Sequence, residues 1–89
     1  MDQEADRLHK AIGLRLRELR HREANLSQEK LAARAGFHRT YVGKLERGET
    51  ASTVDGVAAL CAALGTTLAE FFEPFDRPLK LRGPRRRRL

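Results

Sequence analysis

The chain of 89 residues carries 18 Lys and Arg against 12 Asp and Glu, a single cysteine and no tryptophan. This length fits one small domain and leaves no room for a second of similar size, and one cysteine excludes an intramolecular disulfide. Leu and Ala dominate the apolar residues, which favours packed helices over a sheet, so we predict an all-α domain.

The first predicted helix spans residues 6–23 and follows a flexible N-terminus at residues 1–5. The helix is amphipathic: one face is apolar, and the other faces carry Arg15, Arg17, Arg20 and Arg22. Apolar residues recur four, four and three positions apart and form the stripe expected to face the core. These residues are Leu8, Ile12, Leu16 and Leu19.

Two short helices are predicted next, at residues 28–35 and 38–48. Ser27 directly precedes the first of them and is a favourable N-cap residue. Gly36 follows that helix at a position where a left-handed residue often ends a helix and turns the chain. The third helix therefore begins only one or two residues later, and Gly48 is expected to end it.

Two further helices complete the predicted domain, which we place at residues 6–76. Thr53 is the expected N-cap of a fourth helix that runs through Leu64. A fifth helix covers residues 67–73 and ends at Pro74, which cannot continue it. The fourth helix is expected to bury Val54, Val57, Leu60, Cys61 and Leu64.

The high net charge of +6 comes from the end of the chain. Residues 77–89 hold seven cations and no acid, whereas residues 1–76 hold 11 cations and all 12 acids. Self-repulsion predicts a disordered basic tail at residues 77–89. Such a tail suits contact with the DNA backbone, contact with another acidic partner, or a solubilising role.

The second and third helices are joined by a turn too short for antiparallel packing, so they must cross steeply, as in a helix-turn-helix. Ala32 is small enough to let the third helix approach the second, and Val42 and Leu45 fix the inward face of the third. A rotation of about 100° per residue then turns four residues away from the core. They are Arg39, Thr40, Gly43 and Lys44.

An exposed helix that carries Arg, Thr and Lys suits the major groove of DNA. Arg and Lys bond guanine O6 and N7, and Thr offers a hydroxyl to a base edge and a methyl to thymine. The alternative is a solvated helix face without a ligand. The helix-turn-helix spacing favours DNA.

Three segments together carry a family resemblance: "LRELR", "NLSQEKLAARAGFHRTYVGKLERGE" and "VAALCAALGTTLAEFF". Over residues 8–73 the chain resembles the Xre/Cro phage-repressor-like helix-turn-helix family, and "RTY" with "ERGE" is similar to the controller proteins of restriction-modification systems. The resemblance implies a compact five-helix, lambda-repressor-like fold with the helix-turn-helix at helices two and three. It further implies a DNA-binding transcriptional regulator, either a repressor or an autoregulator, without a cofactor.

The resemblance also implies roles for the matching residues. Positions expected to contact bases are Gln28, Arg39, Thr40 and Lys44. Positions expected to contact the DNA backbone are Ser27, Tyr41 and Arg47. Arg20 and Glu46 match an ion pair that ties the first helix to the recognition helix.

The chain departs from the family pattern in three places. The connection "RHREANLSQ" is one residue longer than usual, which bears on the assignment of Arg20. His38 stands where a small capping hydroxyl is common, and "ETASTV" lacks the proline often found before the fourth helix. None of these departures changes the outward residues of the third helix.

Other chemistries find little support in the sequence. His9, His21 and His38 lie far apart and no second ligand stands at metal spacing, so no metal site is expected. Cys61 has no His or carboxylate placed to activate it and is expected in the core. The glycines do not form a phosphate-binding loop. We therefore expect neither an enzyme nor a cofactor.

Aromatic side chains near the end of the domain exceed what one short helix needs for its own packing, which predicts a homodimer contact. A two-fold dimer would recognise two half-sites of a palindromic operator. The rival interpretation is an antitoxin or adaptor that uses the same residues on an unidentified protein partner. They are Phe71, Phe72 and Phe75.

The acidic start of the chain lacks the features of a secretory signal, and the longest apolar run, from Val57 to Leu64, is far shorter than a bilayer span. We therefore expect a cytoplasmic protein of bacterial or phage origin that does not enter membranes.

Overall fold

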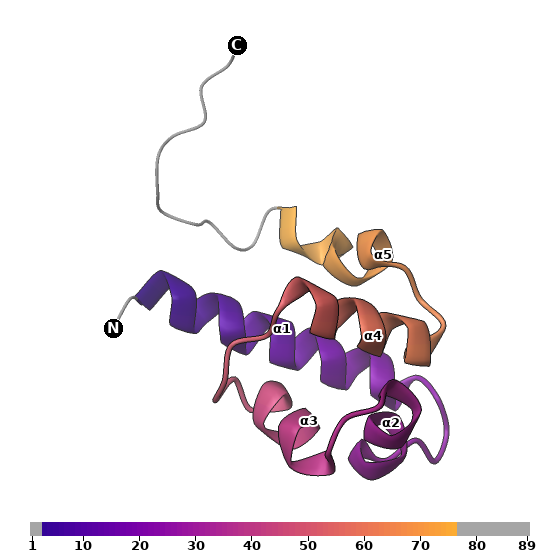
Figure 1. Cartoon of the computed structure of the whole chain (residues 1–89). Helices are drawn as coiled ribbons and strands as arrows, with labels where there is room; N and C mark the ends of the chain where they lie inside the picture. Colours follow the sequence, from indigo (N-terminus) through magenta and orange to yellow (C-terminus); the bar gives the residue numbers. More distant parts are fainter. Residues whose placement is uncertain (1–2, 77–89) are drawn as a thin grey trace.

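The structure, a computed structural model, describes residues 3–76 of the chain. No strand occurs among these residues, and the expected all-α, five-helix class is confirmed. In Figure 1, α5 lies on the opposite side of the molecule from α2 and α3, with α1 and α4 between them. The elements in chain order are α1 Gln3–His21, α2 Gln28–Ala35, α3 Arg39–Glu46, α4 Val54–Leu64, α5 Leu68–Phe72 and a terminal 3-10 turn, η1, Glu73–Asp76.

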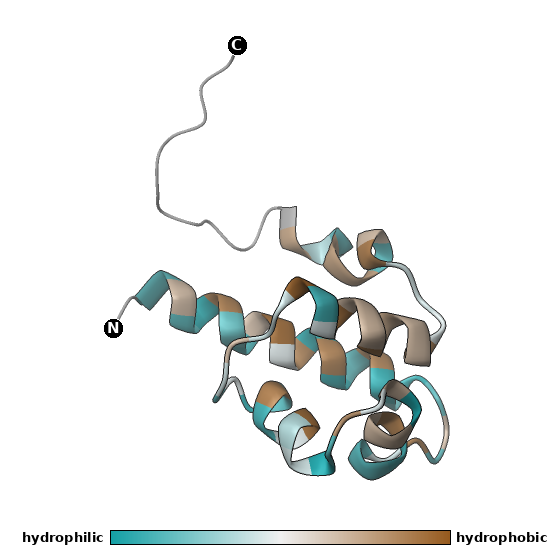
Figure 2. Ribbon diagram, in the orientation of Figure 1, coloured by the Kyte–Doolittle hydropathy of each residue, from teal (hydrophilic) through white to brown (hydrophobic). Residues whose placement is uncertain are grey.

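One hydrophobic core joins all five helices. Figure 2 shows α4 mostly in hydrophobic colours, whereas hydrophilic and hydrophobic residues alternate along α1. This difference fits an amphipathic outer helix and a more apolar inner one. The buried hydrophobic residues are Ile12, Leu16, Leu19, Leu26, Leu31, Ala32, Val42, Leu45, Val57, Leu60, Cys61 and Phe71.

Two residues of α4 expected in the core lie nearer the surface. Val54 is 74% exposed. It is the first residue of α4, so no earlier turn of this helix covers its side chain. Leu64, the last residue of the helix, is only half-buried. By contrast, Cys61 is buried, and this burial raises the pKa of its thiol.

The bounds of α1 differ from the expected ones at both ends. The helix begins at Gln3, so residues 3–5, expected to be flexible, form its first turn. It ends at His21, and hydrogen bonds of the turn type then carry the backbone onward, from Arg22 N–H to Leu19 O and from Glu23 N–H to Arg20 O. The expected basic tail at residues 77–89 lies outside the described residues.

Local capping explains most of the helix ends. Ser27 Oγ accepts from the Lys30 N–H at 3.0 Å, and Thr53 Oγ1 accepts from the Gly56 N–H at 2.9 Å, as expected of N-caps. Gly36 adopts a φ of 80° directly after α2, in the left-handed region that glycine enters without strain. The end of α2 and the start of α3 are therefore separated by a single tight turn.

A capping box at the start of α5 was missed in the sequence. Thr67 Oγ1 accepts from the Glu70 N–H at 3.0 Å, and Glu70 Oε1 accepts from the Thr67 N–H at 2.9 Å and from Thr66 Oγ1 at 2.8 Å. These bonds, led by the backbone N–H of Thr67, lower the pKa of the Glu70 carboxyl. The signal was present as the spacing Thr67-x-x-Glu70.

The backbones of α1 and α3 approach each other closely at Gly13. A Cβ atom at this position would lie 2.2 Å from the Leu45 carbonyl oxygen and 2.7 Å from that of Glu46. Both atoms belong to the backbone, so no side-chain movement could relieve the contact. Gly13 therefore lets α1 support the last turn of α3, the helix expected to contact DNA.

Among residues 3–76, no single helix is both long and apolar enough to cross a membrane. Together, α4 and the segment Leu68–Phe75 reach that length and composition, but they are bent by 105° at the break between them.

Candidate nucleic-acid interface

The second and third helices form a surface whose inner side is fixed by apolar residues. Val42 and Leu45 of α3 are buried, and so is Ala32 of α2, the small residue over which α3 crosses. With this side of α3 inward, Arg39, Thr40 and Lys44 are all exposed. The structure thus places these three predicted base-contacting residues on the outer face of one helix.

His38 begins α3 in place of the usual hydroxyl residue. Its Nδ1 accepts a hydrogen bond from the Thr40 N–H at 3.1 Å, and its backbone is extended. The imidazole thus satisfies one of the free N–H groups at the start of the helix, as a Ser or Thr side chain would. This departure from the family pattern keeps the cap and its geometry.

An ion pair holds α3 to α1 beneath this surface. Glu46 accepts from Arg20 through two parallel bonds, at 2.6 Å from Nε to Oε2 and 2.9 Å from Nη2 to Oε1. Arg20 Nη1 also donates to the Leu26 carbonyl at 3.0 Å, so the longer connection after α1 keeps the pair intact and is itself held by it. The structural role predicted for Arg20 and Glu46 agrees with this geometry.

Gln28 joins the same network from the first turn of α2. Its Nε2 donates to Glu46 Oε1 at 2.9 Å, while its Oε1 lies near Gly43, 3.4 Å from the place a Cβ there would take. Gly43, expected to face outward, is therefore covered by the side chains of Gln28 and Arg47. The half-buried Gln28 is oriented by α3 before any ligand arrives.

Two further predicted contacts have partners within the protein. Arg47 donates to Glu49 through Nε at 2.9 Å and Nη2 at 3.1 Å; these bonds raise the pKa of Arg47 and lower that of Glu49. Tyr41 is half-buried against the Phe37 ring, with centroids 4.8 Å apart, and its hydroxyl lies beside Gly56 in the first turn of α4. Tyr41 thus faces α4 rather than the outer side of α3.

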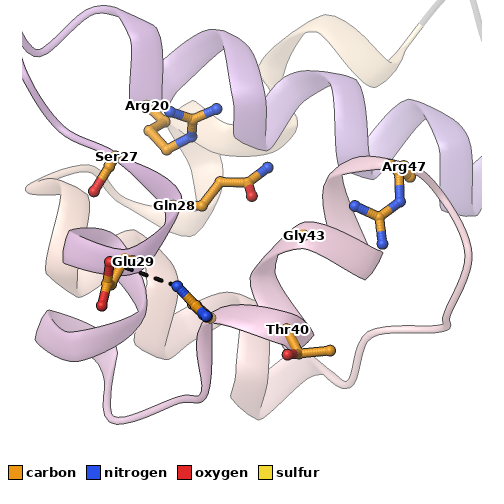
Figure 3. Close-up of a pocket in the computed structure, with 8 residues that line it drawn as sticks. Arg20, Ser27, Gln28, Glu29, Thr40, Gly43 and Arg47 are labelled. Atoms are coloured by element: carbon orange, nitrogen blue, oxygen red, sulfur yellow. Dashed lines mark ion pairs between the residues drawn. The ribbon is translucent and has the colours of Figure 1, made fainter.

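A shallow hollow of about 650 Å³ lies between the start of α2 and α3 (Figure 3). It collects most of the predicted DNA-contacting residues but not Lys44, which is exposed on the same helix outside it, nor Tyr41. The residues that line it are Arg20, Ser27, Gln28, Glu29, Arg39, Thr40, Gly43 and Arg47.

One residue that lines this hollow, Glu29, was not predicted to be part of the site. Glu29 Oε1 lies 3.9 Å from Nη1 of Arg39, and the dashed line in Figure 3 marks this ion pair. The Arg39 side chain is 66% exposed, so the pair is solvated and contributes little to folding. Glu29 comes near Arg39 only because α2 packs against α3, so the sequence alone did not indicate the pair.

Comparison with known proteins decides the family. A family profile described as "Helix-turn-helix domain" matches residues 11–73, which span most of α1 through α5. The chain belongs to this helix-turn-helix family. The expected resemblance to helix-turn-helix regulators is thereby confirmed, and the matched region contains every residue predicted to contact DNA.

Two relatives of this helix-turn-helix protein are similar to it over most of the domain. Control protein C.BamHI of Bacillus amyloliquefaciens is 40% identical over 54 residues, which cover 61% of this chain and 67% of the relative. The HTH-type transcriptional regulator y4dJ of Sinorhizobium fredii is 39% identical over 69 residues, covering 78% and 88%. Both names describe regulators or control proteins rather than enzymes.

A solved structure supports the same placement. The restriction-modification controller protein C.AhdI of Aeromonas hydrophila superposes with a TM-score of 0.68 and 41% sequence identity, over 72% of this chain and 96% of that one. The expected closeness of this helix-turn-helix protein to restriction-modification controllers is therefore confirmed in both sequence and fold.

The aromatic end of the helix-turn-helix domain forms a second candidate surface. Phe71 is only 1% exposed and belongs to the core, so its assignment to a subunit contact does not fit its position. Phe72 is 36% exposed, and Phe75 is half-buried with its ring centroid 5.0 Å from that of Phe72. A mostly apolar hollow of about 320 Å³ lies beside Phe72, lined by Leu8, Ile12, Ser52, Thr53, Val54, Val57, Leu68 and Phe72.

Possible metal ligands do not gather in the described part of the chain. No three His, Cys, Asp or Glu side chains among residues 3–76 are placed to hold one ion. His38 caps α3, and Glu46 and Glu70 are engaged by arginine and by backbone N–H groups.

Proposed function

We propose that this protein is a sequence-specific transcriptional regulator that binds a palindromic operator in double-stranded DNA as a homodimer. Each copy inserts α3 into the major groove. The observation that carries the proposal is the pair of faces on α3: Arg39, Thr40 and Lys44 point to solvent, while Val42 and Leu45 lie in the core.

Base recognition is assigned to the exposed side chains of α3 and to Gln28. Arg39 and Lys44 supply donors for guanine O6 and N7, and Thr40 supplies a hydroxyl and a methyl. Gln28 uses the carboxamide oxygen that its bond to Glu46 leaves directed toward the hollow. Because Glu46 holds this amide, the side chain is ordered before DNA binds, which lowers the entropy cost of binding.

Phosphate contacts are assigned to the start of α2 and the end of α3. The first turn of α2 offers backbone N–H groups and the positive end of the helix dipole, next to Ser27. Arg47 is exposed and exchanges its bonds with Glu49 for a phosphate. The Tyr41 hydroxyl lies beside α4, so Tyr41 contacts the DNA backbone only where the DNA passes that side of the domain.

Replacing Arg39 with alanine is expected to weaken operator binding by about 1–3 kcal/mol, while binding to random duplex DNA changes much less. The arginine accounts for recognition of one base pair, so preference at that pair should also relax. Sites selected from random duplexes would supply the operator, and fluorescence anisotropy would give both affinities.

Arg34→Ala is the matched control for this measurement. Arg34 is an exposed arginine at the end of α2, paired with Glu23 at 2.9 Å and not part of the hollow. Its loss should lower specific and random binding by the same small factor. Equal losses on both DNAs for Arg39→Ala would rule out its role in base recognition.

The homodimer is proposed to form through the apolar hollow beside Phe72. Val54 and Leu68 are exposed there together with Phe72, and exposed apolar residues that cluster in this way are typical of contact surfaces. One α3 helix contacts only a few base pairs, whereas a dimer places two of them about 34 Å apart on successive turns of one DNA face.

Phe72→Glu is expected to convert the dimer to a monomer at micromolar concentration, because a carboxylate would have to be buried in the contact. Sedimentation velocity or light scattering would give the mass. Ala33→Glu is the control: Ala33 is an exposed residue of α2 that does not line this hollow, and its replacement should leave the dimer intact. If the Phe72→Glu variant remained a dimer, the contact would lie elsewhere.

The same apolar hollow supports a second candidate, an antitoxin or adaptor that binds another protein. In that case the wild-type protein would show no sequence preference among random duplexes. The Arg39→Ala variant would bind the protein partner as tightly as the wild type does. The exposed cationic face of α3 serves no purpose in this alternative.

A further inference from the structure

Arg15 of α1 is almost completely buried, although sequence analysis placed it on a solvent-facing side of the helix. Its side chain is 9% exposed. It donates from Nε to the Phe71 carbonyl at 2.8 Å, from Nη2 to the Glu70 carbonyl at 2.6 Å and from Nη1 to Glu18 Oε1 at 3.1 Å. The guanidinium therefore clamps the end of α5 onto α1.

The Glu70 and Phe71 carbonyls both lose a backbone donor at this point of the chain. An N–H at position 74 would donate to Glu70 in an α-helical pattern or to Phe71 in a 3-10 pattern. Pro74 has no N–H, so neither of these two bonds can form. The Glu70 carbonyl still accepts from the Glu73 N–H. Arg15 supplies donors to both carbonyls and makes the turn from α5 into η1 depend on α1.

The same helix holds the recognition helix at another point. Arg20, five residues after Arg15, binds Glu46 of α3. At about 100° per residue, the two arginines point in directions about 140° apart around α1. α1 thus connects the DNA-contacting side to the aromatic end, which lie on opposite sides of the molecule in Figure 1.

We propose that Arg15 is a positioning residue that sets the spacing of the two half-sites. This inference rests on the homodimer of the proposed function, in which Phe72 of α5 contacts a second copy. Because Arg15 fixes α5 relative to α1, and Arg20 fixes α3 relative to α1, the dimer contact and the recognition helix keep one relative orientation.

Small changes in the orientation of the dimer contact relative to α3 would change the half-site spacing that the dimer fits. Suppose that α5 tilts by about 10° relative to α1. Over a distance of about 20 Å, the shortest extent of the molecule, this tilt displaces α3 by about 3.5 Å, which is close to one base-pair step. A loosened α5 would therefore let the dimer fit operators whose half-sites are one pair nearer or farther apart.

The test uses the full chain and a set of duplexes that carry the selected operator with its half-site spacing changed by one or two base pairs. A duplex with a single half-site completes the set. Wild-type protein should lose about 30-fold or more in affinity for each wrong spacing. The Arg15→Lys variant keeps the charge but loses the fork of donors, and its discrimination between spacings should fall below about fivefold.

Two measurements separate this role from general stability. Binding to the single half-site should remain within about twofold of wild type, since α3 is still held by Arg20. Arg17→Lys, an exposed arginine on the same helix, should leave the spacing profile unchanged. Should Arg15→Lys fail to fold, Glu18→Ala is the milder variant, because it removes only one acceptor of the guanidinium and should reduce the spacing preference about threefold.

An unchanged spacing profile in the folded variant would overturn the inference and leave Arg15 as a contributor to stability only. Failure of the proposed function has a different signature, visible in the wild-type protein alone. In that event the wild type would bind the single half-site as tightly as the double one, or would prefer no sequence at all.

Discussion

Replacing Glu46 with alanine is expected to lower the free energy of unfolding by about 3–5 kcal/mol, as is found when one partner of a buried ion pair is removed. The Glu46 side chain is 2% exposed and accepts from Arg20 and Gln28. Without Glu46, the Arg20 guanidinium keeps its hydrogen bond to the Leu26 carbonyl but loses its counter-charge. Urea denaturation followed by circular dichroism would measure the change.

Two further variants define this effect. Glu23→Ala removes an exposed acid that pairs with Arg34, and its cost should be much smaller than that of Glu46→Ala, because the pair is solvated. The double variant Arg20→Met with Glu46→Leu removes both charges and should recover most of the lost stability. A cost below about 1 kcal/mol for Glu46→Ala would show that the pair does not hold α3 to α1.

Gly13→Ala is expected to cost about 2–3 kcal/mol of stability, although alanine is the better helix former by about 1 kcal/mol. The added Cβ would meet the carbonyl oxygens of Leu45 and Glu46, so the backbones of α1 and α3 must separate. The displaced α3 should also weaken operator binding more than random binding. Thermal denaturation and anisotropy would record the two effects.

Gly43→Ala is the matched control, since it also replaces a glycine in the middle of a helix. A Cβ at Gly43 would lie 3.1 Å from Arg47 Nη1 and 3.4 Å from Gln28 Oε1, both at the ends of flexible side chains. The fold should therefore keep or gain stability. If Gly13→Ala were as stable as Gly43→Ala, the close approach of α1 and α3 would not limit this fold.

Features that depend on neighbouring residues could be predicted from the sequence. The caps at Ser27 and Thr53 and the left-handed Gly36 follow from short-range hydrogen bonding and backbone sterics. The inward face of α3 followed from the spacing of Val42 and Leu45, and the Arg20–Glu46 pair from the family resemblance. The caps, Gly36 and the inward face of α3 required no knowledge of where α1 lies. The Arg20–Glu46 pair does join α1 to α3, and only the resemblance indicated it.

Features that depend on how distant elements pack were not predicted. Gly13 appears in the sequence as a weak helix position, and only the approach of the α3 backbone gives it a role. Arg15 resembles its solvent-facing neighbours until α5 places two carbonyls beside it. Phe71 and Phe72 are adjacent and chemically identical, and the direction of α5 alone decides which of them enters the core.

The division of α3 into a buried and an exposed face has a consequence for the evolution of this protein. Arg39, Thr40 and Lys44 are exposed, so substitutions there have little effect on the fold, and under the proposed function they change DNA preference. Gene duplication followed by single substitutions at these positions could therefore yield regulators with new operators. Mutations at Gly13 or Glu46 would instead be removed by selection for stability, whatever operator the descendant binds.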